Sequence, residues 1–386
     1  DLASDALVIA LEKWPQSGVP DNPAAWLMGT AKHRAIDSIR RGRMVDRKHS
    51  EIAPAIESER DDVADTLVEA IDDDIGDDLL RLVFMTCHPV LSTESRVALT
   101  LRLLGGLTTA EIARAFLAGE ATIAQRIVRA KKTLSDAKVP FEVPRGDDRA
   151  DRLASVLEVV YLIFNEGYSA TSGDDWMRPT LCEEAMRLGR VLASLAPDEP
   201  EVHGLLALME IQASRSRART GSNGEAILLL DQDRARWDRL LINRGLSGLS
   251  RAIELGGEEG LYTLQAAIAA CHARARTAEE TEWMEIARLY EILEEKVPSP
   301  VIELNRAVAV SMAYGPAEGL AIVDALQSEP SLKSYHLLPS VRGDLLAKLG
   351  RNDEAIKEFE RAASLTLNVR EKDVLQGRAS SLRTVV

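Results

Sequence analysis

The sequence contains few aromatic residues and few cysteines. Phe, Trp and Tyr make up 4% of the 386 residues, and the three cysteines (Cys87, Cys182 and Cys271) are far apart. An odd number of scattered cysteines does not form a disulfide framework and is typical of a reducing cytoplasm. The sequence shows no secretory signal and no apolar run of membrane-spanning length, so we expect a soluble, cytoplasmic protein without a membrane partner.

Motifs for catalysis and for metal binding are also missing. The sequence contains no glycine-rich phosphate loop and no nucleophile elbow. Cys87 and His88 are adjacent, but no second Cys/His pair stands at ligand spacing, which favours a structural role for them. We therefore expect a protein that is not an enzyme and that holds no metal and no cofactor.

The residues that are abundant indicate an all-α fold. Ala, Leu, Glu and Arg dominate the sequence, as they do in stacked helices, and 386 residues are enough for two or three domains. The net charge of -14 argues against a protein that binds nucleic acid over its whole surface. It does not exclude local basic patches, and the charges are arranged in blocks.

A first basic segment, residues 24–49, has seven Lys or Arg against two Asp. A helix should begin after Asn22, a good N-cap followed by Pro23, and run to about Arg41. Its arginines form either a solvated face or a phosphate-binding face, and Trp26 is either a core residue or a stacking surface for an unpaired base. The candidate residues of this segment are Asn22, Trp26, Arg34, Arg40, Arg41 and Arg43.

An acidic segment, residues 57–78, follows with eleven Asp or Glu and one Arg. This composition is typical of a solvated linker, and the alternative interpretation is that the acids compete with DNA for the basic segments. About thirty extended residues span on the order of 95 Å, which exceeds two DNA turns of ~34 Å each. Two DNA elements can therefore be held at once by modules on either side.

Residues 107–134 show the pattern of a helix-turn-helix. Two helical patterns, 109–117 and 121–134, are broken at Ala118 and Gly119. The predicted inward residues are Ile112, Ala113, Phe116, Ile123, Ala124, Ile127, Val128 and Leu134. The second helix would enter the major groove with Thr122, Gln125, Arg126 and Arg129, whereas Lys131 and Lys132 are placed for phosphates.

These segments resemble a known family. Residues 1–43, with DNPAAWLMGTAKHRAIDSIRRGR, resemble region 2 of sigma-70-type factors, and residues 80–144, with LTTAEIARAFLAGEATIAQRIVRAKKTL, resemble region 4. The whole chain is similar to extracytoplasmic-function sigma factors that carry a tetratricopeptide-like C-terminal extension. The resemblance implies that the first basic segment binds and opens the downstream, minus-ten promoter element, and that the helix-turn-helix reads the upstream, minus-thirty-five element.

The resemblance also implies that RNA polymerase core enzyme and promoter DNA are the partners. Asp1, Asp5 and Glu12 would belong to the polymerase-binding surface, and a further helix is expected before Asp1. The expected domains are an incomplete region 2 (1–49), an acidic linker (50–78), region 4 (79–145) and a C-terminal regulatory repeat domain (146–386). Two alternatives are a helix-turn-helix regulator with a partner-sensing repeat domain and a helical enzyme built on acidic loops.

The C-terminal part shows a weak period of 34 residues. Ala287, Ala321 and Ala355 are 34 residues apart, and Ala252 is 35 residues before Ala287. Thirty-four is the tetratricopeptide period, in which small residues stand where paired helices approach. The period predicts an array of helix pairs that presents a binding surface.

Two acid-rich stretches interrupt this pattern, and both are expected to be loops. The first is residues 161–179 and the second is residues 228–239. They hold either a metal or acid/base cluster, or helix caps and salt bridges, and the second interpretation is the simpler one. We expect these loops to contact the DNA-binding modules or an unknown protein. Their candidate residues are Asn165, Glu166, Asp174, Asp175, Trp176, Arg178, Asp231, Asp233, Arg234 and Trp237.

Overall fold

The computed structural model describes residue 30 and residues 78–116, 118–144, 147–170, 177–221 and 226–383. All residues predicted to contact polymerase or the downstream element lie between 1 and 43, outside the described residues. Asp174, Asp175 and Trp176 lie outside them as well. Residues 83–140 and 144–386 belong to one compact unit.

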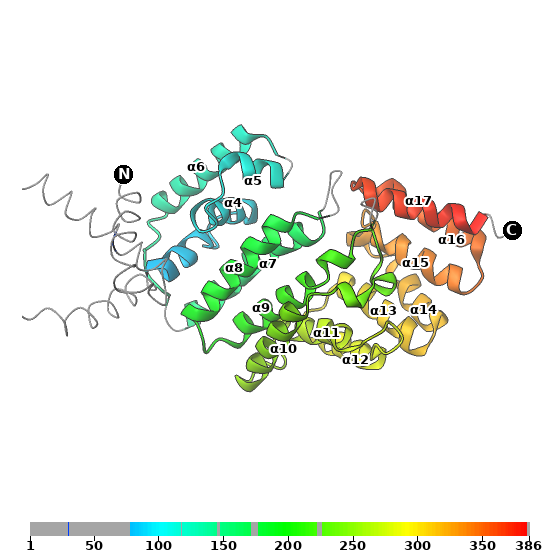
Figure 1. Cartoon of the computed structure of the whole chain (residues 1–386). Coiled ribbons are helices and arrows are strands. Elements are labelled where there is room, and N and C mark those ends of the chain that lie inside the picture. Colours follow the sequence, from blue (N-terminus) through cyan, green and yellow to red (C-terminus); the bar gives the residue numbers. More distant parts are fainter. Residues whose placement is uncertain are drawn as a thin grey trace, which may run out of the picture. The chain divides into compact units, whose positions relative to one another are not determined.

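The described part of the chain is helical and contains no strand, which confirms the predicted all-α fold (Figure 1). Residues 78–86 are helical. They are followed by the α-helices α4 (Thr93–Leu103), α5 (Thr109–Ala115), α6 (Glu120–Asp136), α7 (Asp147–Tyr168), α8 (Pro179–Leu195), α9 (Pro200–Ala213), α10 (Arg239–Glu254), α11 (Leu261–Arg274), α12 (Trp283–Lys296), α13 (Pro300–Tyr314), α14 (Pro316–Leu326), α15 (Leu337–Lys348), α16 (Asn352–Leu365) and α17 (Val369–Arg383). Four short 3-10 helices are η1 (Ser216–Ala218), η2 (Leu229–Asp231), η3 (Arg234–Arg236) and η4 (Pro330–Leu332).

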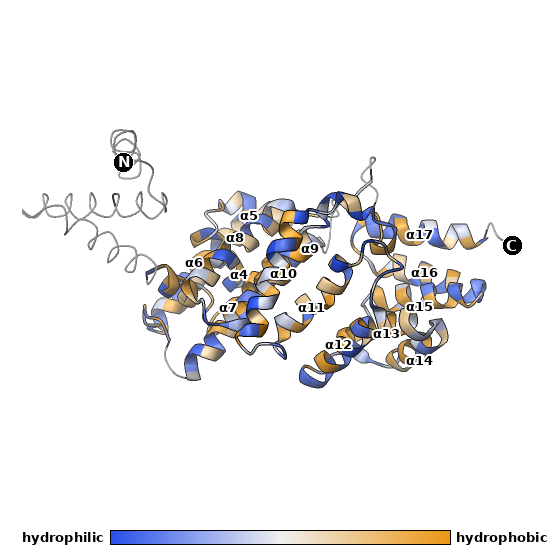
Figure 2. Ribbon diagram, turned by 60° about the horizontal axis from the view of Figure 1, so that its bottom comes forward, coloured by the Kyte–Doolittle hydropathy of each residue, from blue (hydrophilic) through white to orange (hydrophobic). Residues whose placement is uncertain are grey.

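From α7 to α17, each helix packs against the next one along the chain. Apolar residues recur on one side of most helices, and these sides face neighbouring helices (Figure 2). One core cluster, around Phe359, joins α13 to α17, and another, around Leu293, joins α11, α12 and α13. The helices are stabilised mainly by this shared burial, since a single amphipathic helix has little stability alone.

The 34-residue period predicts that four alanines stand where helices approach each other, and this prediction is wrong for one of them. Ala252, Ala287 and Ala355 are buried, whereas Ala321 is exposed. In α14 the close approach is made by Gly319, where an added Cβ would lie 2.7 Å from the carbonyl oxygen of Ala307 in α13. The small residue at this helix contact therefore stands two positions earlier than a strict period requires.

No helix among the described residues is both long enough and apolar enough to cross a bilayer.

Candidate nucleic-acid interface

Local signals in the sequence determine where α4, α5 and α6 begin. Ser92 caps α4, and its hydroxyl accepts a hydrogen bond from the Ser95 amide. Before α5, the Thr108 amide donates to the Glu111 carboxylate at 2.7 Å, and the Glu111 amide donates to the Thr108 hydroxyl at 3.2 Å. This reciprocal pair is a capping box. Gly119 is the N-cap of α6, which confirms the predicted break between the two helices.

The apolar faces of α4, α5 and α6 form the core of the helix-turn-helix. Ile112 and Ile123 are fully buried, as predicted, and Ile127 and Leu134 are buried beside them. Ala113 is buried as predicted, and Phe116 is half-buried. Ala124 and Val128 were predicted inward but are exposed, Val128 at 65%, and Ala130 is buried instead. The buried stripe of α6 is therefore narrower than predicted and leaves more of the helix exposed.

The exposed face of α6 carries a polar stripe opposite the core, which we call the recognition stripe. It consists of residues three or four positions apart, Thr122, Gln125, Arg129 and Lys132, and all four are exposed. No ion pair among the described residues involves Arg129 or Lys132, so neither charge is neutralised by a neighbour. Lys131 is also exposed but stands on one flank of the stripe.

Arg126 does not belong to this stripe. It is half-buried and lines a hollow of about 340 Å³ between the helix-turn-helix and α7. Its charge acts on Glu94 of α4, whose pKa is lowered by hydrogen bonds from its own backbone and from Ser92 and, to a smaller extent, by Arg126. The sequence grouped Arg126 with the base-reading residues, but the turn of the helix places it beside the core.

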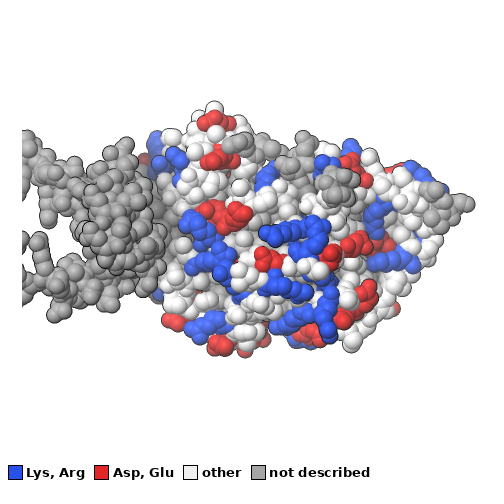
Figure 3. Space-filling view, in the orientation of Figure 1, with Lys and Arg blue, Asp and Glu red and all other residues white. Residues whose placement is uncertain are grey.

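The rest of the visible surface is electrically mixed. Lys and Arg side chains lie over α6 at one edge of the molecule, whereas basic and acidic side chains are interspersed over the visible faces of the later helices (Figure 3). A duplex attracts a face where positive charge is not neutralised, so α6 is the better candidate for DNA.

The helix-turn-helix is joined to α7 by a buried hydrogen-bond network around Ser155. The Ser155 hydroxyl accepts a hydrogen bond from the Arg96 guanidinium at 2.5 Å and donates to the Cys87 carbonyl at 2.7 Å. Arg96 also pairs with Glu158 at 2.9 Å. Arg152 donates to the Phe84 carbonyl at 2.8 Å. Two turns of α7 therefore bind the segment before α4 and α4 itself.

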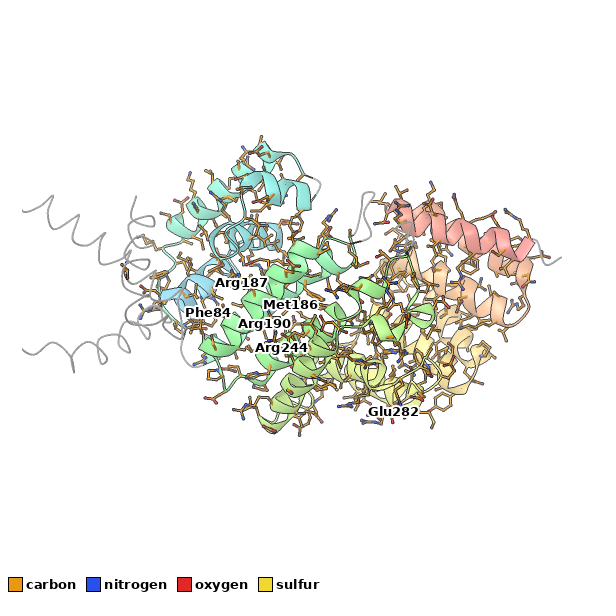
Figure 4. The ribbon with its side chains drawn as sticks, in the orientation of Figure 1. Phe84, Met186, Arg187, Arg190, Arg244 and Glu282 are labelled. Atoms are coloured by element: carbon orange, nitrogen blue, oxygen red, sulfur yellow. The ribbon has the colours of Figure 1, made fainter. Side chains whose placement is uncertain are left out.

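A second connection comes from α8. Arg187 (Figure 4) donates to the Leu104 carbonyl at the end of α4, at 2.5 Å, and is held by Glu184 one turn earlier. Both connections use α4 and its flanks, and neither uses the recognition stripe. The C-terminal helices thus pack on the side of the helix-turn-helix that lies away from the exposed face of α6.

Comparisons with known proteins find matches to both parts of this chain. Residues 81–134 match the model of sigma-70, region 4, and residues 152–253 match a family of unknown function, DUF6596. The chain is 44% identical over 376 residues to "Uncharacterized protein R00370" of Rhizobium meliloti (strain 1021), and the match covers 96% of this chain and 88% of that protein. The chain belongs to the family of this rhizobial protein.

The region 4 match supports membership of the sigma-70 superfamily and a role as a sigma factor or a helix-turn-helix DNA-binding protein. It covers α4, α5 and most of α6, so the interface described above is region 4 itself. The residues that join region 4 to α7 and α8 were not found by sequence reasoning. Arg96, Arg152 and Arg187 stand in amphipathic helices and look like ordinary solvated arginines.

The expectation that the first acidic stretch is a loop is wrong for Asn165 and Glu166, which belong to the last turn of α7 and lie close to region 4. Asn165 and Glu166 line the same hollow as Arg126. Glu166 forms an ion pair with Arg178, and Arg178 lines a second hollow with Leu107 of region 4. Asn165, Glu166 and Arg178 therefore lie beside region 4.

In the second loop, Arg234 and Trp237 are buried within the C-terminal helices and are not exposed for a contact with region 4. Arg234 is buried and donates to the carbonyls of His272 and Ala275 at the end of α11, at 2.7 and 2.9 Å. Trp237 is buried beside it. Arg234 is drawn inward because free carbonyls at a helix end accept hydrogen bonds from cations.

Asp231 and Asp233 of the second loop are exposed, and one of them caps a short helix. Asp233 is exposed and caps η3 by accepting a hydrogen bond from the Ala235 amide, while Asp231 is exposed at the end of η2. Among the described residues, no group of three or more His, Cys, Asp or Glu could hold a metal ion.

Cys87 is buried where region 4 meets α7. Its sulfur lies 3.4 Å from the Thr100 hydroxyl, and burial raises the pKa of the thiol. A buried thiol in its protonated form is a packing group and not a nucleophile.

Proposed function

We propose that the chain is a sigma factor of the extracytoplasmic-function type, which binds RNA polymerase core enzyme and directs it to promoters. The observation that supports this proposal most directly is the recognition stripe of α6 in a region 4 domain. It is exposed, basic and free of ion pairs with described residues, and the C-terminal helices leave it uncovered.

Within this proposal, α6 reads the upstream promoter element. Gln125 can pair with adenine and Arg129 with guanine through two hydrogen bonds each, and Thr122 lies between them and the helix N-terminus. Lys131 and Lys132 would bind phosphates. Arg126 would contact DNA only if its side chain left the hollow beside Glu94, so we give it a lesser part in base recognition.

We further propose that the C-terminal domain regulates region 4. The packing on α4 argues against simple occlusion of α6, since the exposed face stays accessible. Regulation would instead act through α7, which holds α4 through Ser155 and lines the hollow beside Arg126 through Asn165. A ligand or protein that shifts α7 would change the position of region 4 only to the extent that it binds the two arrangements unequally.

The test of base recognition is binding of the full chain to promoter duplexes with matched and mismatched upstream elements. Arg129→Ala and Gln125→Ala should each cost ~1–3 kcal/mol on the matched element and less on mismatched ones. Lys132→Ala should weaken all sequences alike and reduce the salt dependence by about one unit. Arg244→Ala is the control, because Arg244 is an exposed arginine of α10. Unchanged selectivity in Arg129→Ala would show that α6 does not read bases.

The polymerase assignment is tested with core enzyme. The full chain should be retained by core polymerase in a pull-down and should start transcription from a cognate promoter, whereas a regulator that only binds DNA should do neither. The downstream element is tested by salt titration on fork-junction DNA with the triple variant of Arg40, Arg41 and Arg43 to Ala. The salt slope should fall by roughly one unit per arginine, and an unchanged slope would mean that these arginines form a solvated face.

A further inference from the structure

The C-terminal domain encloses a polar cavity that the proposed role of region 4 does not use. Its volume is about 250 Å³, and residues of α7, α9, α11, α12 and α13 line it. Tyr161, Tyr168, Gln212, His272 and Asn305 are among the lining residues, and Arg215, just after α9, is also one. No Asp or Glu lines the cavity. A positively charged group therefore faces a space that contains no negative charge from the described protein.

Three side chains of this wall have buried polar atoms without a partner among the described residues. They are Gln212 Oε1, Arg215 Nε and His272 Nδ1. Arg215 is 7% exposed and His272 is 8% exposed, so bulk water reaches little of either residue. Buried polar groups in native proteins are almost always hydrogen-bonded, which means that an unpaired set around one cavity requires an explanation.

Arg215 is the most unusual member of this set. None of the hydrogen bonds or ion pairs between described residues involves its guanidinium, which lies 5.7 Å from the ring centre of Tyr168 and 5.8 Å from that of Trp237. Aromatic faces attract a cation weakly and do not neutralise it. A buried charge without a counter-ion is costly, and the cost is removed when an anion binds.

The surroundings of Arg215 add to the positive potential. Arg234 also lies over the Trp237 ring, with 5.0 Å between guanidinium and ring centre, and its own hydrogen bonds go to carbonyls and a hydroxyl. Burial, Arg215 and Arg234 together lower the pKa of His272 to about 3, so its imidazole is neutral at physiological pH. The imidazole can therefore donate or accept a hydrogen bond without adding a charge.

Water molecules alone would satisfy the hydrogen bonds of such a cavity but not its charge. A guanidinium presents a planar fork that matches a carboxylate, and a single arginine balances a single negative charge. We propose that this cavity binds a small organic carboxylate, with the carboxylate on Arg215 and with Gln212 and His272 hydrogen-bonded to polar groups of the ligand.

The position of the cavity gives its ligand a route to region 4. Asn165 of α7 lines both this cavity and the hollow that contains Arg126. A ligand in the cavity would therefore contact a helix that also binds α4. This consequence for DNA binding rests on the proposed function, whereas binding of the carboxylate does not, so the two are measured separately.

Acetate is the probe for the full chain. It carries the carboxylate that Arg215 would bind, and this group is common to all candidate ligands. Succinate and citrate are larger probes, and inorganic phosphate and sodium chloride at equal ionic strength are the controls. Binding is measured by calorimetry and by the shift in melting temperature. We expect a carboxylate to bind in the millimolar range or tighter and to raise the melting temperature with its concentration.

The variants locate the site. Arg215→Met should bind the carboxylate about 10- to 150-fold more weakly, since a hydrogen bond to a charged group contributes about 1.5–3 kcal/mol. The affinity of Arg215→Lys should lie between those of Arg215→Met and the native protein. Arg244→Met, an exposed arginine outside the cavity, should bind normally. If Arg215→Met does not fold, Gln212→Leu serves instead and should also weaken binding.

Three results would overturn the proposal: no carboxylate binds, carboxylates bind Arg215→Met and Gln212→Leu as tightly as the native chain, or phosphate binds and carboxylates do not. Promoter binding with and without the carboxylate is a separate measurement. If the carboxylate binds while promoter affinity stays unchanged, the site stands and the route through α7 fails.

Discussion

Replacing Ser155 by Ala should loosen region 4 from α7 without unfolding either. Ser155 is 8% exposed and is the one residue that both accepts from Arg96 and donates to the Cys87 carbonyl. Without the hydroxyl, the buried carbonyl loses its donor, and water reaches the position poorly. The native structure therefore loses a hydrogen bond that the separated arrangement can replace with water.

The size of the effect follows from which groups are left unpaired. Arg96 keeps its contacts with Glu158 and with the Thr93 hydroxyl, so its charge is not orphaned. The Cys87 carbonyl is orphaned, which costs about 1–3 kcal/mol. Separation of region 4 from α7 should thus become about 5- to 150-fold more frequent.

Cysteine modification measures this separation, because the chain has three buried thiols in different places. The thiol reagent is used at a concentration where region 4 returns to α7 faster than the thiol is labelled. Under this condition Cys87 should react about 5- to 150-fold faster in Ser155→Ala than in the native chain. Cys182 in α8 and Cys271 in α11 should keep their rates. Ser194→Ala is the control, since that exposed hydroxyl only donates to a carbonyl of its own helix. Equal Cys87 rates in all proteins would refute the role given to Ser155.

Three further outcomes concern the C-terminal helices, α7 to α17. Gly343→Ala should lower the melting temperature, because its Cβ would lie 2.9 Å from the Phe359 ring and overpacking costs about 1–3 kcal/mol. The pKa of His272 is lowered from 6.5 to about 3 in the folded chain. Between these two pH values the imidazole is protonated in the unfolded chain and neutral in the folded chain. The free energy of unfolding should therefore be fully retained above pH 6.5 and should fall by on the order of 4 kcal/mol as the pH is lowered to 3, as measured by urea unfolding. In His272→Gln this fall should be smaller. Burial raises the pKa of Asp344, but Arg378 and a lysine lower it below its usual value, so its contribution is lost as the pH falls below about 4. The difference in melting temperature between the native chain and Asp344→Asn should accordingly narrow below pH 4.

The helix-turn-helix could be predicted from the sequence because its signals are local. A cap before α5, a glycine before α6 and apolar residues at helical spacing are all visible within thirty residues. The same spacing allows two stripes on α6, however, and only packing against α4 decides between them. That is why Val128 was predicted inward and is exposed, and why Arg126 was placed among the base-reading residues.

The contacts between distant segments could not be predicted. Ser155 meets Cys87 across 68 residues of chain, and Arg234 reaches carbonyls about 40 residues away. Neither pair has a pattern of spacing, because the partner of each side chain is a backbone group that every residue carries. Arg215 belongs to RSRAR, three alternating arginines without a neighbouring acid, and this run was the available signal for the cavity.

The shared network at Ser155 affects how chimeras of this family should be made. A natural place to exchange C-terminal segments between relatives is the short connection before α7, where region 4 ends. That cut would pair Arg96 and Cys87 of one protein with the α7 of another, and any relative lacking the serine would leave the carbonyl unpaired. A functional exchange should therefore keep α7 and α8 with the region 4 they hold, and join the parental sequences after Leu195 instead.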